Sequence, residues 1–162
     1  MSDIELSING QRVRKSVEDH RLLVSFLRED VGLTGTHVGC DTSQCGACVV
    51  SVDGATVKSC TMLAVQAHGR SVTTIEGVSK DNVLHVVQDA FHRHHALQCG
   101  YCTAGLVMTA IDLIEREKDR LTRDGVAHAL KGNLCRCTGY QNIINAILDA
   151  AARLNAEPQA VQ

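Results

Sequence analysis

The chain has 162 residues, a formal net charge of −2 and a sequence pI of about 6.4. This slightly acidic balance argues against a nucleic-acid-binding protein, because such proteins usually carry a basic domain. No apolar run approaches the roughly 18 residues that a membrane-spanning helix needs, and the acidic segment Met1–Glu5 lacks the apolar region of a secretion signal. We therefore expect a cytoplasmic protein with no transmembrane segment, at most peripheral at the inner face of a membrane through a larger complex.

The first predicted elements are a β-hairpin and a short helix. Residues 3–8 alternate between apolar and polar side chains, as a half-buried strand does. Asn9-Gly10 supplies the two positive-φ positions of a tight turn, so residues 11–17 are expected to pair with the first strand. Apolar residues at helical spacing then predict a short helix over residues 21–30 that crosses the hairpin.

A cysteine-bearing loop follows the helix, and short strands follow the loop. The pattern predicts three of these strands, over residues 47–52, 55–58 and 72–75. Two hairpins, one helix and one further strand are typical of a β-grasp, ferredoxin-like module. We expect this module to occupy residues 1–76 as an N-terminal domain, with residues 77–81 as a linker.

After the linker the apolar period changes to 3.6, which indicates helices. Three stripes predict helices, and their apolar residues run from Val83 to His94, from Ala104 to Ile114 and from Ile143 to Leu154. Thr122 is placed to cap one more short helix that ends near Leu130. The predicted fold class is therefore α+β, with a four-helix bundle over residues 82–155 after the β-grasp domain and a tail over residues 156–162.

The eight cysteines fall into two sets of four, and none is left over. Without a secretion signal, metal ligation is favoured over disulfide bonds. Cys40, Cys45, Cys48 and Cys60 have the C-x4-C-x2-C spacing, followed by a distant fourth cysteine, that is typical of a plant-type [2Fe–2S] ferredoxin. Glycines within that loop can turn tightly and direct backbone N–H groups at the sulfur atoms.

The second set consists of Cys99, Cys102, Cys135 and Cys137. Each of its two pairs directly precedes a predicted helix, so two helix N-termini would meet at one anionic centre, which their free N–H groups favour. We expect a second [2Fe–2S] cluster there. Zinc remains an alternative, more for the second set than for the first, because zinc sites usually contain C-x2-C pairs.

The cysteine motifs, with their flanking residues, resemble those of a known family. The matching segments are Cys40–Cys48, Ser59–Thr61, Gln98–Thr103 and Gly132–Tyr140. Together they look like the small iron–sulfur subunit of the xanthine oxidase family of molybdenum hydroxylases, over about residues 3–155. Within that family, residues 34–45 and 56–67 look most like the small subunit of aerobic carbon monoxide dehydrogenase.

The resemblance implies an electron-transfer subunit of an oxidoreductase, with no catalytic residue of its own. A large partner subunit would carry a molybdopterin-type molybdenum cofactor and oxidise the substrate with water as the oxygen source, and a medium subunit would carry FAD. The complex would be a dimer of heterotrimers, that is, a heterohexamer. The helical-domain cluster would lie nearest the molybdopterin, with Gln98 and Cys137 in contact with the pterin.

The chain departs from the family pattern after its second helical-domain cysteine. The family usually has Cys-Thr-Pro-Gly, whereas this chain has Cys102-Thr103-Ala104-Gly105. Loss of a proline from the first turn weakens the start of the helix slightly without removing a ligand. Since many relatives act on N-heterocycles or aldehydes, that substrate class stays open, as do a free-standing ferredoxin-like carrier and a zinc-stabilised interaction module.

Overall fold

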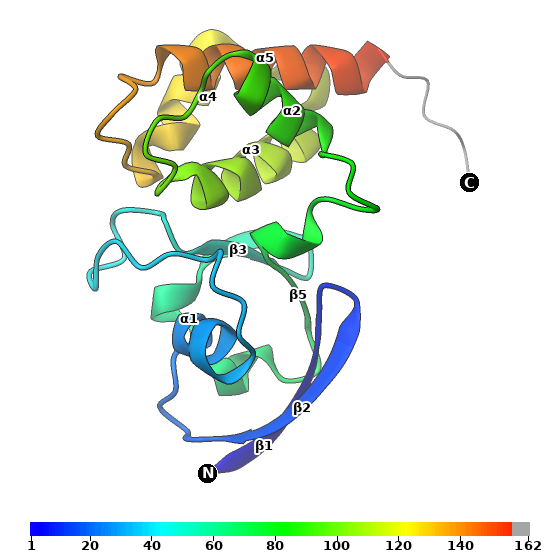
Figure 1. Ribbon diagram of the computed structural model, residues 1–162, viewed down its shortest axis with the longest axis vertical. Helices are drawn as coiled ribbons and strands as arrows, with labels where there is room; N and C mark the ends of the chain where they lie inside the picture. Colours follow the sequence, from blue (N-terminus) through cyan, green and yellow to red (C-terminus); the bar gives the residue numbers. More distant parts are fainter. Residues whose placement is uncertain (157–162) are drawn as a thin grey trace.

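The computed structural model describes residues 1–156, and the predicted tail beyond Ala156 lies outside the described residues. A sheet-containing N-terminal part and a helical C-terminal part are stacked end to end, with the N-terminus at the far end of the sheet (Figure 1). This arrangement confirms the predicted α+β class.

The sheet has the strand order β2-β1-β5-β3-β4. Its strands are β1 Ser2–Ile8, β2 Gln11–Val17, β3 Val49–Val52, β4 Ala55–Lys58 and β5 Ser71–Thr73. Strands β1 and β5 are parallel, and the other neighbours are antiparallel. Strand β5 lies between β1 and β3 and so joins the β1–β2 and β3–β4 hairpins into one sheet.

The opening hairpin forms as the sequence predicts. Ser2 pairs with Val17 and Ile8 with Gln11, while Asn9 and Gly10 take φ values of 51° and 80°. The alternating apolar residues of β1 are buried against the single helix of this part. Alternation and turn chemistry therefore set the register of the hairpin together.

The predicted helix over residues 21–30 is present but has mixed hydrogen bonding. Helix α1 spans Leu23–Ser25, and a π-helical turn continues it over Phe26–Asp30. Gly32 follows with φ of 85°, a conformation that suits glycine at a helix end. Leu23, Phe26 and Leu27 are completely buried, so the wider turn still presents its apolar residues to the sheet.

The largest errors in the predicted strand boundaries are two residues. Strand β3 begins at Val49 instead of residue 47, because Ala47 and Cys48 still belong to the cysteine loop. Strand β5 ends at Thr73, because Ile75 begins a 3-10 turn, Ile75–Gly77. Two further 3-10 turns, Ser59–Thr61 and Ala64–Ala67, connect β4 to β5.

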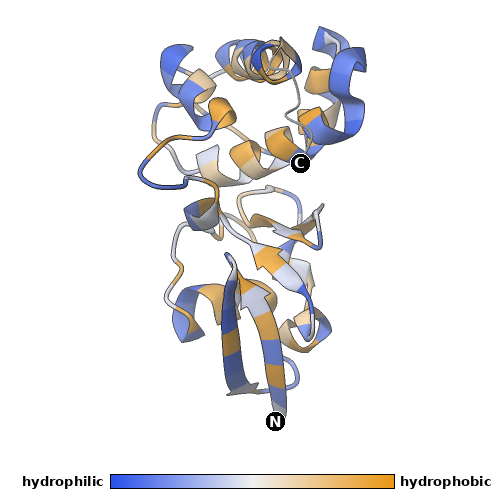
Figure 2. Ribbon diagram, turned by 90° about the vertical axis from the view of Figure 1, so that its right-hand side faces the viewer, coloured by the Kyte–Doolittle hydropathy of each residue, from blue (hydrophilic) through white to orange (hydrophobic). Residues whose placement is uncertain are grey.

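The C-terminal part contains the helices α2 Val86–Arg93, α3 Thr103–Glu117, α4 Arg123–Ala129 and α5 Gln141–Ala156. Short 3-10 turns follow α3 and α4, over Lys118–Arg120 and Leu130–Gly132. The hydroxyl of Thr122 accepts a hydrogen bond from the N–H of Gly125, as the predicted cap requires. The four helices share one apolar core, which lies on their inner faces (Figure 2).

The predicted start of the first helix in this part is wrong. Val83 and Leu84 were expected on its apolar stripe, but they are 68% and 52% exposed. Residues 81 and 82 have positive φ, and the ring of His85 caps the helix by accepting from the N–H of Val87. The turn and the cap together place both apolar side chains outside the helix.

Helix α3 packs on strand β3 and so joins the two parts. A Cβ atom on Gly105 of α3 would lie 2.1 Å from the carbonyl oxygen of Gly46. The helix can therefore approach the cysteine loop only because residue 105 has no side chain. None of the helices in residues 1–156 has the length and apolar character that crossing a membrane requires.

Candidate metal centres

The first cysteine set is assembled by the loop before β3 and the turn after β4. Cys40 and Cys45 lie on the loop, Cys48 directly precedes β3, and Cys60 lies in the 3-10 turn that follows β4. The buried Ser59 ties the last two together, because its N–H and its hydroxyl donate to the carbonyl of Cys48 over 3.3 and 2.6 Å. Antiparallel pairing of β3 with β4 thus brings the distant fourth cysteine back to the loop.

Backbone N–H groups surround the sulfur of Cys40. The N–H of Cys45 donates to it over 3.4 Å. Hydrogen bonds from the backbone of Cys45, Thr42 and Gln44 lower the pKa of Cys40 to about 6. The thiolate is the form that ligates iron, so this loop stabilises the ligand state before any metal binds.

The other thiols of this set are crowded. Burial and the neighbouring Cys48 raise the pKa of Cys60 to about 11, and Cys40 and Cys45 add to the effect. Burial also raises the pKa of Cys45. Thiols placed this close together cannot all ionise unless a cation offsets their mutual repulsion, and a binuclear iron centre supplies that charge.

The second set lies where α3 begins and where the loop before α5 passes. Cys102 is the residue before the first turn of α3. Burial and the neighbouring Cys135 raise the pKa of Cys102 to about 12, with a smaller effect from Cys99. Burial opposes ionisation of Cys135, but hydrogen bonds from Thr138 and the N–H of Cys137 outweigh it and lower its pKa.

The two predicted pterin contacts lie next to each other. The side-chain amide of Gln98 donates to the carbonyl oxygen of Cys137 over 3.2 Å. Cys99 and Cys137 are exposed, whereas Cys102 and Cys135 are half-buried. The second set therefore has an outer and an inner side, and Gln98 lies on the outer one.

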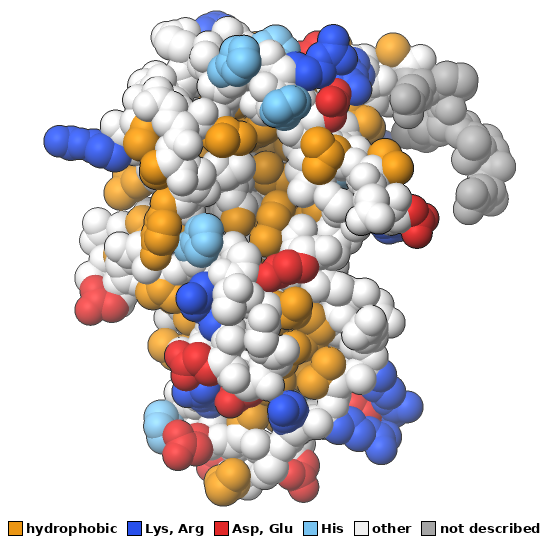
Figure 3. Space-filling model, in the orientation of Figure 1, with side chains coloured by type: hydrophobic (Ala, Val, Ile, Leu, Met, Phe, Trp, Pro, Cys, Tyr) orange, Lys and Arg blue, Asp and Glu red, His pale blue; other side chains and the backbone are white. Residues whose placement is uncertain are grey.

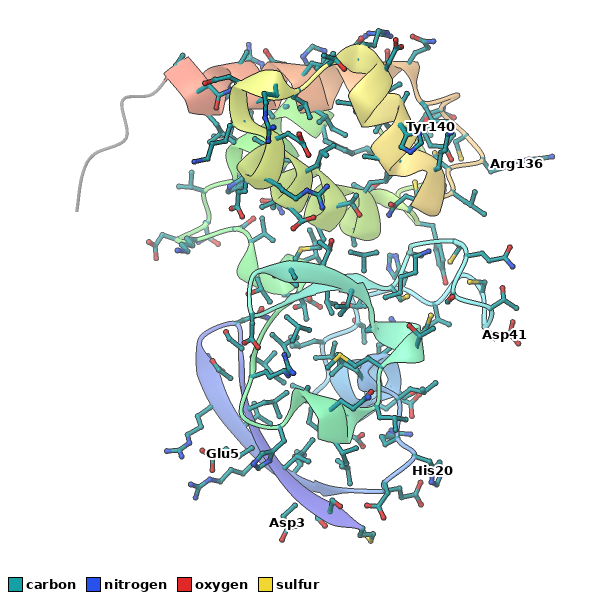
Figure 4. The ribbon with its side chains drawn as sticks, turned by 180° about the vertical axis from the view of Figure 1, so that it is seen from behind. Asp3, Glu5, His20, Asp41, Arg136 and Tyr140 are labelled. Carbon is teal, nitrogen blue, oxygen red and sulfur yellow. The ribbon has the colours of Figure 1, made fainter. Side chains whose placement is uncertain are left out.

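Tyr140 organises the second cysteine loop; it ends the matching segment Gly132–Tyr140, but the sequence did not predict this role. Its hydroxyl accepts from the N–H of Cys135 over 2.8 Å and donates to the carbonyl of Asn133 over 2.9 Å. Figure 4 shows its ring directed into the loop, while Arg136 points away into solvent. The C-x-C segment is thus folded around one phenol group, and residues 133–140 contain no helix or strand.

The two cysteine loops are bonded to each other. The N–H of Leu134 donates to the carbonyl of Cys45 over 2.8 Å. The buried side chain of Asn133 donates to the carbonyl of Gly46 over 3.2 Å and accepts from Thr109 of α3. Asp41 and Arg136, one from each loop, lie at the same side of the molecule (Figure 4).

These features fit two [2Fe–2S] clusters. In the first set Cys60 has the other three thiols as neighbours and N–H donors are directed at the sulfur of Cys40; in the second set Cys102 has Cys135 and Cys99 as neighbours. Within residues 1–156, no three His, Cys, Asp or Glu side chains converge closely enough to hold a single metal ion. The eight cysteines stay the predicted ligands of the two clusters.

Comparisons with known proteins bear on both sets. A model described as a 2Fe-2S iron-sulfur cluster binding domain matches residues 6–74, and one described as a [2Fe-2S] binding domain matches residues 74–148. Each cysteine set falls within one of these matches. The chain therefore contains two domains of the [2Fe–2S]-binding kind.

Relatives match nearly the whole chain. The caffeine dehydrogenase subunit gamma of Pseudomonas sp. (strain CBB1) is 50% identical over 150 residues, 89% of this chain and 87% of the relative. The nicotine 6-hydroxylase small subunit of Paenarthrobacter nicotinovorans is 48% identical over 152 residues, 94% and 91% of the two chains. In the crystal structure of quinoline 2-oxidoreductase from Pseudomonas putida 86, one chain matches with a TM-score of 0.91 and 48% identity over 95% of both chains. The chain belongs to the small iron–sulfur subunits of the xanthine oxidase family of molybdenum hydroxylases, the electron-transfer subunits of oxidoreductases.

Proposed function

We propose that this chain passes electrons singly from a molybdopterin-type cofactor on a large subunit to FAD on a medium subunit. Hydroxylation of a substrate C–H bond with water as the oxygen source releases two electrons and two protons. The chain therefore has to pass two electrons, one after the other, for each substrate molecule. When bound, each [2Fe–2S] cluster would supply a one-electron redox centre.

One hydrogen bond carries this proposal. The N–H of Leu134, next to Cys135, donates to the carbonyl of Cys45 over 2.8 Å. It connects a predicted ligand of one cluster to a predicted ligand of the other through backbone atoms alone. A free-standing carrier of the ferredoxin type needs only the first cysteine set, so a bonded path between two sets favours a relay.

The surface near both sets supports stable docking to larger partners. Four apolar side chains close to the cysteines are exposed, Val38, Leu97, Tyr101 and Leu134, by 45%, 40%, 49% and 58%. Hydrophobic side chains are visible on the surface around the junction of the sheet-containing part and the helical part (Figure 3). Exposed apolar groups gathered near a functional centre are typical of a protein interface. In this arrangement Gln98 and Cys137 face the subunit that holds the pterin, and the first set faces the flavin subunit.

An aromatic N-heterocycle is the substrate class that we propose for the complex. The named relatives are a caffeine dehydrogenase, a nicotine 6-hydroxylase and a quinoline 2-oxidoreductase. None of them is named for carbon monoxide, so the predicted closeness of residues 34–45 and 56–67 to carbon monoxide dehydrogenase has less support than the N-heterocycle alternative. The heterohexameric assembly and the cytoplasmic location remain predictions.

Rapid mixing of the purified complex with its substrate tests the relay. Quinoline and caffeine serve as first substrates, and flavin absorbance is followed over time. We expect flavin reduction in the wild-type complex and its loss in Cys45→Ser, while the molybdenum signal still responds to substrate. Normal flavin reduction by substrate in Cys45→Ser, with the first cluster absent, would refute a route through this chain.

A further inference from the structure

The loops of the two cysteine sets are also joined by an aromatic pair outside the predicted ligands. The ring of His37, three residues before Cys40, stacks on the ring of Tyr101, which lies between Cys99 and Cys102. The ring centroids are 4.5 Å apart and the planes are inclined by 16°. We call this pair the His37–Tyr101 clasp. It connects residues 64 positions apart in the chain.

Two hydrogen bonds hold the clasp in one geometry. Nδ1 of His37 is 2.8 Å from the carbonyl oxygen of Tyr101, and the hydroxyl of Tyr101 donates to the carbonyl of Val38 over 2.8 Å. Ring stacking alone would allow the rings to slide, whereas these two bonds run in opposite directions between the same segments. The relative position of residues 37–38 and residue 101 is therefore closely defined.

The clasp also reaches the neighbourhood of the first cluster. A Cβ atom on Gly39 would lie 3.1 Å from the sulfur of Cys45 and 3.6 Å from a ring carbon of Tyr101. The tyrosine ring thus covers the glycine that borders the predicted iron ligands. In Figure 1 the loop over residues 36–48 lies directly below the start of α3. Tyr101 is two residues before the first residue of that helix.

Two separate contacts hold the first cysteine loop to the helical part. At one end the clasp contacts residues 37–39, and at the other end Asn133 and Leu134 bond to Gly46 and Cys45. A loop held at both ends has fewer ways to move than a loop held at one point. Tyr101 is also 49% exposed, so its ring contributes less to a hydrophobic core than a buried aromatic ring does.

We propose that His37 and Tyr101 are positioning residues that fix the distance and orientation between the two clusters. This inference rests on the proposed relay, because it concerns the step between its two centres. Neither residue ligates iron or touches substrate. Their role is to keep the loop of the first cluster from turning away from the start of α3.

The magnetic interaction between the two reduced clusters tests the clasp. Dipolar coupling falls with the inverse cube of the distance between spins, so pulsed EPR of the dithionite-reduced complex at low temperature reports the geometry directly. We expect a shifted coupling, and a changed relaxation enhancement, in His37→Leu and Tyr101→Leu. Tyr101→Phe keeps the stacked ring and loses only the bond to Val38, so its shift should be smaller. His37→Phe should likewise retain part of the wild-type coupling.

A matched control is His20→Leu, since His20 is an exposed histidine at the opposite end of the sheet part (Figure 4). We expect wild-type coupling in this variant. If Tyr101→Leu fails to hold the second cluster because residue 101 adjoins Cys102, His37→Leu decides the question. Unchanged coupling in His37→Leu, with both cluster signals and the iron content intact, would overturn the clasp. A wild-type complex without two cluster signals would instead refute the relay itself.

Discussion

At Gly105 helix α3 closely approaches the first cysteine loop, and this contact allows a quantitative prediction. A Cβ atom there would lie 2.1 Å from the carbonyl oxygen of Gly46 and 3.2 Å from Cα of Ala47. Both are backbone atoms of buried residues, so neither can rotate aside. Overpacking a buried contact costs about 1–3 kcal/mol, while alanine in place of glycine returns about 1 kcal/mol of helix propensity. With a rigid obstacle the upper end of the cost applies, and we expect Gly105→Ala to destabilise the contact by about 2 kcal/mol.

Hydrogen–deuterium exchange at the amide of Leu134 measures this loss directly, because that N–H donates to Cys45 across the same junction. A loss of about 2 kcal/mol in local stability raises the open population, and with it the exchange rate, by a factor of up to about 30. Gly125→Ala in α4 is the matched control. Its Cβ would approach only the hydroxyl of Thr122, at 3.1 Å, so any disturbance of that cap is offset by the helix propensity that alanine gains. We expect the control to change stability by less than about 1 kcal/mol. Wild-type protection of Leu134 in Gly105→Ala would refute the close-contact reasoning.

Two further predictions concern α2 and the first cysteine set. Nδ1 of His85 accepts a hydrogen bond from the N–H of Val87. Burial lowers the pKa of His85; Glu115 acts to raise this pKa, and Lys80 acts to lower it further. His85 therefore binds a proton more readily in the unfolded chain than in the folded one. The free energy of unfolding should fall as the pH drops through about 6.5. His85→Asn keeps a capping side chain and should remove this slope from urea midpoints measured at several pH values; an unchanged slope would contradict the assignment to His85. Cys45→Ser should abolish the EPR signal of the first cluster and leave that of the second, whereas loss of both signals would mean that the two sets do not form separate clusters.

Local patterns in the sequence were sufficient to predict most elements. Asn9-Gly10 and the alternation before it predicted the hairpin, and the hydroxyl of Thr122 predicted the start of α4, because each signal acts within a few residues. The start of α2 was predicted wrongly, because the prediction relied on apolar spacing alone. Val83 and Leu84 continue its apolar stripe by spacing, but a positive-φ turn and a histidine cap exclude them from the helix. Periodicity cannot detect such a turn.

The candidate ligands could also be predicted from spacing, since cysteines at fixed offsets carry the chemistry of the cluster. The contacts between the two sets could not. Asn133 bonds to Gly46 across 87 positions, and His37 stacks on Tyr101 across 64. These pairs have no local signature, because an asparagine, a histidine or a tyrosine in a loop is compatible with many partners. Only the packing of α3 on β3 brings them together.

The presence of two [2Fe–2S] clusters in this chain is tested most directly by metal analysis combined with EPR of the dithionite-reduced protein purified anaerobically. Two clusters require about four iron atoms per chain, and the eight cysteines should yield two distinguishable [2Fe–2S] signals. Zinc in place of iron, with no paramagnetic signal after reduction, would contradict both the cluster assignment and the relay built on it.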